Sequence, residues 1–242
     1  MEISISPEVL GHLGSLPITN SLLVVFLVDI ILIVGFLIIT RKLTVVPKGG
    51  QFFAETLFDG MYDFMLGLAD SKKLVSRMFP YLMTIFLFFL CCNLLEFIPG
   101  ITALTYNGTP VFRNPVTDLN VVFTISMLSF IIMELTGIIS GGLWKGYLRK
   151  FFDFSSPVNF GIGLMELVNE YSRPISLTFR IFGNLFAGVV ITIVLMKMAP
   201  YIIPVPFNLL ALAISIIQPF VFIVLVLVFT KLNVYEAASP QH

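Results

Sequence analysis

The most informative scarcity in this sequence is that of charged residues. Only 12% of the 242 residues are charged, 57% are hydrophobic, and the mean hydropathy is +1.00. A soluble domain of this length needs far more charge on its surface, so the chain is predicted to be an integral membrane protein. Its formal net charge is zero, which argues against the basic face that a nucleic-acid partner requires.

Residues that supply catalysis or bind metals are scarce as well. The two histidines, His12 and His242, lie near the chain ends, and Cys91 and Cys92 are adjacent within an apolar run. There is no His-Glu-x-x-His, no Gly-x-Ser-x-Gly and no Gly-x-x-x-x-Gly-Lys motif. We therefore expect no metal, no cofactor and no catalytic chemistry in this chain, and we interpret the cysteines as buried small hydrophobic residues.

Three apolar runs have the length of a single membrane crossing. They cover about residues 20–40, 78–98 and 118–139. The first run contains Asp29, which we expect to face protein and not lipid. Residues 1–20 are expected to form an outer segment with little regular structure.

Residues 51–70 differ from these spans because acids interrupt the apolar pattern. Glu55, Asp59 and Asp63 recur every four residues, so they lie on one face of a helix. The pattern predicts an amphipathic helix along the membrane surface, not across it.

Basic residues set the predicted orientation. With the crossings above, most of them fall on one side: Arg41, Lys42, Lys48, Lys72, Lys73, Arg77, Lys145, Arg149 and Lys150. By the positive-inside rule this side is cytoplasmic, which places the N-terminus outside and the C-terminus in the cytoplasm.

The apolar stretch over about 157–198 is too long for one ordinary crossing. As a helix it measures roughly 60 Å, against about 30 Å of hydrocarbon. It is either two crossings or one strongly inclined helix; we favour the inclined helix, which Pro174 would kink and not end. A last helix over about 207–231 completes a long hairpin, 157–232. The fold class is thus all-α, a single membrane domain over 1–242 with about three upright transmembrane helices, one surface helix and this hairpin.

Arg180 lies within the first helix of the hairpin with no acid three or four residues away. An arginine at that depth costs roughly 2.5 to 17 kcal/mol, so it indicates a functional site. Nearby small residues, Ser176, Gly183, Ala187 and Gly188, would let another helix approach closely. Its counter-ion is therefore predicted to be a carboxylate on a partner within the membrane; the alternative is Glu96 or Asp118 of this chain.

These residues resemble subunit a of the F-type ATP synthase membrane sector. The likeness centres on residues 176–184, Ser-Leu-Thr-Phe-Arg-Ile-Phe-Gly-Asn, with Ala187-Gly188 after them. It extends to residues 93–96, Asn-Leu-Leu-Glu, to residues 115–120, and to Gln218 in the last helix. It covers nearly the whole chain.

The resemblance implies a stator subunit of a rotary ATP synthase, not itself an enzyme. Its partners would be rotor c-ring subunits carrying a membrane carboxylate, peripheral-stalk b subunits and the lipid bilayer. Arg180 would meet the ring carboxylate between two offset ion half-channels, coupling ion flow to rotation. The expected location is a bacterial plasma (inner) membrane, with an organellar inner membrane as the alternative.

The resemblance also implies an ion pathway through this chain. Its candidate residues, besides Arg180, are Glu166, Asn184, Gln218, Glu96, Asp118 and Ser176. Glu166 would serve the cytoplasmic half-channel or simply pair with Arg173, and Glu96 and Asp118 would serve the outer one or cap helix ends. Asn184 and Gln218 would orient Arg180 or hold the two long helices together. Glu134, Glu170 and Asp29 are interpreted as structural.

One departure affects the outer half-channel. Many family members carry a titratable residue where this sequence has Val189, and another where it has Ala211. Other groups, or water alone, would then have to serve that path here. A secondary transporter is the competing class, but it usually shows two related halves, and the Arg180 segment has no repeat.

Overall fold

The computed structural model describes residues 8–13, 16–41, 43–98, 100–101, 105–106, 109–141, 157–198 and 204–238. Its long helices are α1 (Asn20–Thr40), α2 (Gly50–Ala69), α3 (Lys72–Glu96), α4 (Leu119–Gly141), α6 (Pro157–Met198) and α7 (Pro204–Ala238). All of these except α2 are long and apolar enough to cross a membrane. The predicted all-α membrane fold is confirmed.

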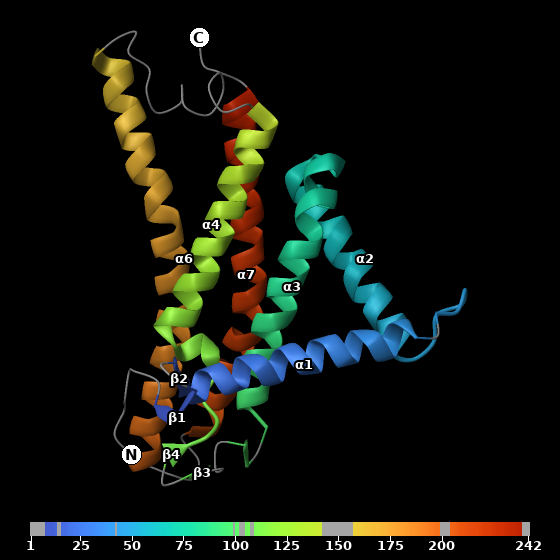
Figure 1. Ribbon diagram of the computed structural model, residues 1–242, viewed down its shortest axis with the longest axis vertical. Coiled ribbons are helices and arrows are strands. Elements are labelled where there is room, and N and C mark those ends of the chain that lie inside the picture. The colour runs from blue at the N-terminus through green and yellow to red at the C-terminus, as the bar shows by residue number, and fades with distance from the viewer. Residues whose placement is uncertain are drawn as a thin grey trace.

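Helix α7 lies at the centre of the bundle, in contact with α3, α4 and α6 (Figure 1). Its residues Phe222, Ile223, Val226 and Leu227 are almost completely buried. Because neighbours cover α7 on several sides, its sequence is apolar around most of its circumference and not along one stripe.

Helix α6 continues through Pro174 as one helix of 42 residues. At 1.5 Å per residue it is about 60 Å long, so the single long helix is favoured over two crossings. It begins at the end of the bundle where α7 finishes and runs antiparallel to α7 (Figure 1). Together the two helices form the predicted hairpin.

Helix α1 runs crosswise to α3, α4, α6 and α7 in Figure 1. Its buried residues all lie in its first half, at Asn20, Ser21, Val24 and Val28. Asp29 is exposed on this chain, so the expectation that it faces protein stays a prediction and would require a partner subunit. Beyond Val28 no residue of α1 is fully buried, and the helix runs crosswise to the bundle (Figure 1), a direction that the sequence pattern does not encode.

Helix α2 is amphipathic, as predicted. Met61, Met65 and Ala69 are buried, while the acids at positions 55, 59 and 63 are exposed. Its placement along a membrane surface stays a prediction. In Figure 1, α2 carries the chain from the end of α1 up to the beginning of α3. The basic turns before and after α2 therefore lie at different levels, and the orientation also stays a prediction.

Several predicted boundaries differ from the structure. Helix α3 begins at Lys72, where the Ser71 hydroxyl accepts a hydrogen bond from the Leu74 amide at 3.4 Å and caps the helix. Helix α7 continues to Ala238, beyond the predicted end at 231. The basic loop with Lys145, Arg149 and Lys150 lies outside the described residues.

Short antiparallel hairpins occur where little regular structure or a loop was expected. Near the N-terminus, β1 (Val9–Leu13) pairs with β2 (Leu16–Thr19), which corrects the prediction of an irregular segment there. Before α4, β3 (Thr105–Tyr106) pairs with β4 (Thr109–Pro110). The 3₁₀ helix η2 (Pro115–Thr117) then leads into α4.

Candidate functional site

The side chain of Arg180 is exposed on the outer face of α6. The opposite face is fixed by Leu177, Ile181 and Leu185, which recur every four residues and are at most 7% exposed. Burying this stripe turns Arg180 and Asn184 away from the bundle. The residues that share the exposed face with them are Ser176, Gly183 and Ala187.

Arg180 has no acid partner among the residues that the structure describes. The described ion pairs involve Arg173 and Lys231 instead. Of the two in-chain candidates, Glu96 receives a hydrogen bond from Asn114 and Asp118 from the backbone of Asn120. Neither carboxylate forms an ion pair with Arg180.

The surface around Arg180 is open to close approach. A Cβ atom built on Gly183 would meet nothing within 4 Å. Large apolar side chains frame the small residues, with Phe179 62% exposed and Ile175 50% exposed. An arginine among small residues, bordered by uncovered apolar ones, forms a surface that another membrane helix can pack against.

Gln218 of α7 lies at the level of Arg180. Gly188 stands opposite Ala211, whose Cβ would lie 4.0 Å from a Cβ atom built on Gly188, and Thr192 donates a 3.4 Å hydrogen bond to Asn208. In an antiparallel pair with this register, the position opposite 180 is about 219. Oε1 of Gln218 is buried and has no hydrogen-bond partner among the described residues. Such a group normally finds a partner or ordered water.

A cluster of hydrogen-bonded polar side chains joins α3, η2 and α7. Nδ2 of Asn114 donates to Glu96 at 2.7 Å and to Oδ1 of Asn93 at 3.3 Å. Nδ2 of Asn93 then donates to the Ser215 carbonyl at 2.9 Å. Ser215 precedes Gln218 by three residues, so the two lie on the same side of α7. The cluster leads from the ends of α3 and η2 toward the level of Arg180.

Asp118 caps α4. Its carboxylate accepts a hydrogen bond from the Asn120 amide at 3.0 Å, and its side chain is almost completely buried. This geometry satisfies a free amide at the helix start. Of the two alternatives for Asp118, the contact supports the helix cap.

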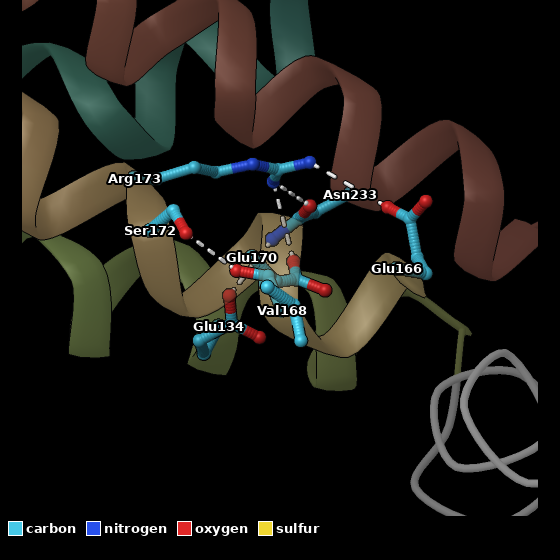
Figure 2. Close-up of polar contacts among 7 residues, drawn as sticks. All are labelled: Glu134, Glu166, Val168, Glu170, Ser172, Arg173 and Asn233. Atoms are coloured by element: carbon cyan, nitrogen blue, oxygen red, sulfur yellow. Dashed lines mark hydrogen bonds and ion pairs between the residues drawn. The ribbon is translucent and has the colours of Figure 1, made fainter. Parts of the chain in front are cut away.

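Arg173 contrasts with Arg180 because it is buried and fully engaged (Figure 2). Its Nη1 atom is 3.2 Å from Glu170 and donates to Oδ1 of Asn233 at 2.6 Å. Its Nη2 atom is 3.8 Å from Glu166. The Phe229 ring lies 5.1 Å from the guanidinium carbon, a cation–π contact. Glu166 thus lies beside Arg173 and remains partly exposed, at 28%.

Sequence reasoning missed two members of these clusters. Asn114 precedes η2 and gave no periodic signal. Asn233 lies beyond the predicted end of the last helix. Had that end been placed correctly, a polar residue inside a buried helix would have been a signal. In the structure Asn233 is 1% exposed and donates to Glu134 of α4 at 3.1 Å.

The described residues offer charge placement and a polar path, and no catalytic set. No group of three His, Cys, Asp or Glu residues capable of holding a metal ion occurs among them. An exposed cation in an apolar span can attract a mobile anion, and flanking polar clusters can conduct water or ions. This arrangement suits ion transfer along a protein interface.

Comparison with known proteins agrees with that chemistry. The family model described as "ATP synthase A chain" matches residues 22–231. The chain is 31% identical to "ATP synthase subunit a" of Moorella thermoacetica over 225 residues, 93% of this chain and 95% of the relative. It is 32% identical to "ATP synthase subunit a, sodium ion specific" of Propionigenium modestum over 238 residues, 95% of this chain and 79% of the relative.

Proposed function

The chain belongs to the ATP synthase A chain family, whose members are non-catalytic, ion-translocating subunits of the membrane sector, and on this premise we propose that α6 presents Arg180 to a rotor ring carrying membrane carboxylates. The observation that carries the proposal is the state of Arg180. It is exposed on an apolar helix and has no acid partner among the described residues. An uncompensated cation within a membrane is costly, so its anion must come from elsewhere.

A rotating ring suits this role because it would bring its carboxylates to Arg180 one after another and carry them away again. As a ring carboxylate passes Arg180, the nearby positive charge favours its ionised form. The same charge opposes the passage of a free cation and so separates the two half-channels. Release of the ion from the carboxylate to one side of the membrane and loading of an ion from the other side then make the ring rotate in one direction.

The outer half-channel is proposed to use Glu96, Asn114 and Asn93, leading to Gln218. The hydrogen bonds that join Glu96, Asn114, Asn93 and the Ser215 carbonyl support a polar path as far as Ser215. The unpaired, buried Oε1 of Gln218 provides its inner end. This route replaces the titratable residues that the family often has at the positions of Val189 and Ala211.

The cytoplasmic half-channel is proposed to use Glu166, with Ser176 between it and Arg180 along α6. Glu166, Ser176 and Asn184 all lie on α6, and Ser176 and Asn184 are exposed on the face that carries Arg180. The residual exposure of Glu166 supports access to water. Asn184 is exposed and not enclosed between α6 and α7, which supports a role beside Arg180 over a role in joining the two helices.

The subunit is an integral membrane protein of the ATP synthase membrane sector. We further propose a bacterial plasma membrane location, with the N-terminus outside and the C-terminus in the cytoplasm, and contact with peripheral-stalk b subunits. The bacterial relatives support the location. One of them is named as sodium ion specific, so transport assays should test protons and sodium separately.

The decisive experiment maps the polypeptide that covers Arg180. Single cysteines replace Phe179 or Gly183 in the assembled complex, and one at Leu135 on α4, which is 52% exposed, serves as the control. We expect disulfide cross-links to ring-subunit cysteines from positions 179 and 183 and none from position 135. Cross-links from position 135 alone would place the ring elsewhere and refute the proposal.

A further inference from the structure

A buried amide joins three helices at the end of the bundle where α6 begins. Asn233 of α7 lies between Arg173 of α6 and Glu134 of α4 (Figure 2). Its Oδ1 accepts from Arg173 at 2.6 Å, and its Nδ2 donates to Glu134 at 3.1 Å. Gly137 of α4 makes the approach close, because a Cβ atom built there would lie 3.5 Å from Cβ of Asn233.

Asparagine is well suited to this place. A carboxamide has one face that accepts and another that donates, so it can serve a cation and an anion at once. Its charged neighbours also fix which way the amide points, with the oxygen toward the guanidinium. A carboxylate at 233 would satisfy Arg173 but repel Glu134, and an aliphatic residue would leave both without this partner.

The amide determines where Arg173 points. Nη1 of Arg173 is held by Asn233 and Glu170, and the Phe229 ring lies against the guanidinium. With that edge fixed, Nη2 is directed at Glu166, 3.8 Å away. A planar guanidinium transmits this constraint because its nitrogens cannot move independently.

We propose that Asn233, braced by Glu134, is a positioning residue that holds Arg173 against Glu166 at the cytoplasmic entrance of the ion path. The inference rests on the proposed role of Glu166. It extends that role to two residues on different helices that do not themselves touch the ion. Its consequence is that α4 and α7 set the geometry of a group on α6.

The test exchanges the amide and the acid. Asn233→Asp alone puts two carboxylates side by side, whereas Glu134→Gln/Asn233→Asp restores one amide and one acid with the hydrogen bond between them reversed. We expect ATP-driven ion pumping by the assembled complex in membrane vesicles to fall about tenfold in the single variant, since a displacement of about 1 Å can cost up to about a hundredfold in rate. The double variant should recover most of the wild-type rate.

Lys231→Met is the matched control. Lys231 lies two residues away on roughly the opposite face of α7 and anchors it to α2 through Asp70 and the Leu68 carbonyl. It tests whether any weakened anchor of α7 lowers the rate. We expect pumping by this variant to stay within about twofold of wild type, consistent with an exposed ion pair. A loss equal to that of Asn233→Asp would overturn the proposal.

A double-mutant cycle separates positioning from a merely structural role. In a Glu166→Gln background, Asn233→Asp should cause little further loss, because the two act through the same pair. A full tenfold further loss would overturn the inference. All rates are normalised to the amount of assembled subunit; if Asn233→Asp does not accumulate, Asn233→Ser takes its place in the cycle with the same two outcomes.

The outcome also separates this inference from the function on which it rests. If Glu166→Gln slows pumping but Asn233→Asp does not, the positioning role fails and the proposed function survives. If Glu166→Gln leaves pumping unchanged, the assigned role of Glu166 fails, and the inference fails with it.

Discussion

Arg173 and Arg180 lie on one helix, seven residues apart, in opposite states. Arg173 is 7% exposed and has two acids, an amide and an aromatic ring around it. Arg180 is exposed and has no acid partner among the described residues. The described residues thus supply counter-ions to Arg173 and none to Arg180. The comparison distinguishes an arginine that neighbouring helices enclose from one that the described residues leave exposed.

The largest expected effect is on transport, from Arg180. Arg180→Ala should abolish ATP-driven ion pumping and allow passive ion leak, because it removes the charge proposed to meet the ring carboxylate and to oppose a free cation. Pumping is measured in inverted vesicles, with protons and sodium tested separately. Arg77→Ala, which removes an exposed arginine at the beginning of α3, is the control and should pump normally. Coupled pumping by the Arg180 variant would remove the contrast.

The next effect is on stability, from Arg173. Arg173→Leu leaves Glu170, which is 1% exposed, without its cation, and breaking such a buried pair costs about 3–5 kcal/mol. We expect a large loss of assembled subunit, measured by its amount in membranes. The double variant Arg173→Leu/Glu170→Leu should recover much of it, because an apolar pair can replace a buried ion pair. Equal losses in the single and double variants would contradict this account.

A smaller effect is expected on the rate, from Glu166. Glu166→Gln should slow pumping about tenfold while leaving the amount of assembled subunit unchanged, because the amide keeps the shape but cannot exchange a proton as a carboxyl group does. Rates are compared per assembled complex. An unchanged rate would leave Glu166 as a companion of Arg173 and no more.

The smallest effect is expected at the exposed pair of Asp70 and Lys231. Their nitrogen and oxygen are 2.8 Å apart, but the side chains are 75% and 40% exposed. Such surface pairs contribute about 0–1 kcal/mol. Asp70→Asn should therefore leave the thermal stability of the purified complex almost unchanged, and a marked loss would show that this pair resembles the buried one.

Most helices follow from the sequence because burial in lipid imposes long apolar runs. The predicted first span matches α1 residue for residue, and the long helix matches α6. The ends were harder to predict. Helix α3 begins earlier because Ser71 caps it, and α7 continues past Lys231 because Asn233 and Thr230 are buried against neighbouring helices.

The absence of an acid within one helical turn of Arg180 could be predicted, because it depends only on the spacing of acids along one helix. The amide clusters could not. Asn93 meets Ser215 across 122 residues, and Asn233 meets Glu134 across 99. These contacts depend on how α7 packs between its neighbours, and periodicity within one helix carries no information about that.

The sequence by itself determined that this chain is a membrane protein, that it forms long helices, and that Arg180 has no acid within one helical turn. Each of these follows from composition or from spacing along a single helix. Only the tertiary structure decided which arginine is enclosed, where Asp29 points and which amides link the helices. Those features arise from contacts between distant segments, which the packing of α7 against α3, α4 and α6 creates.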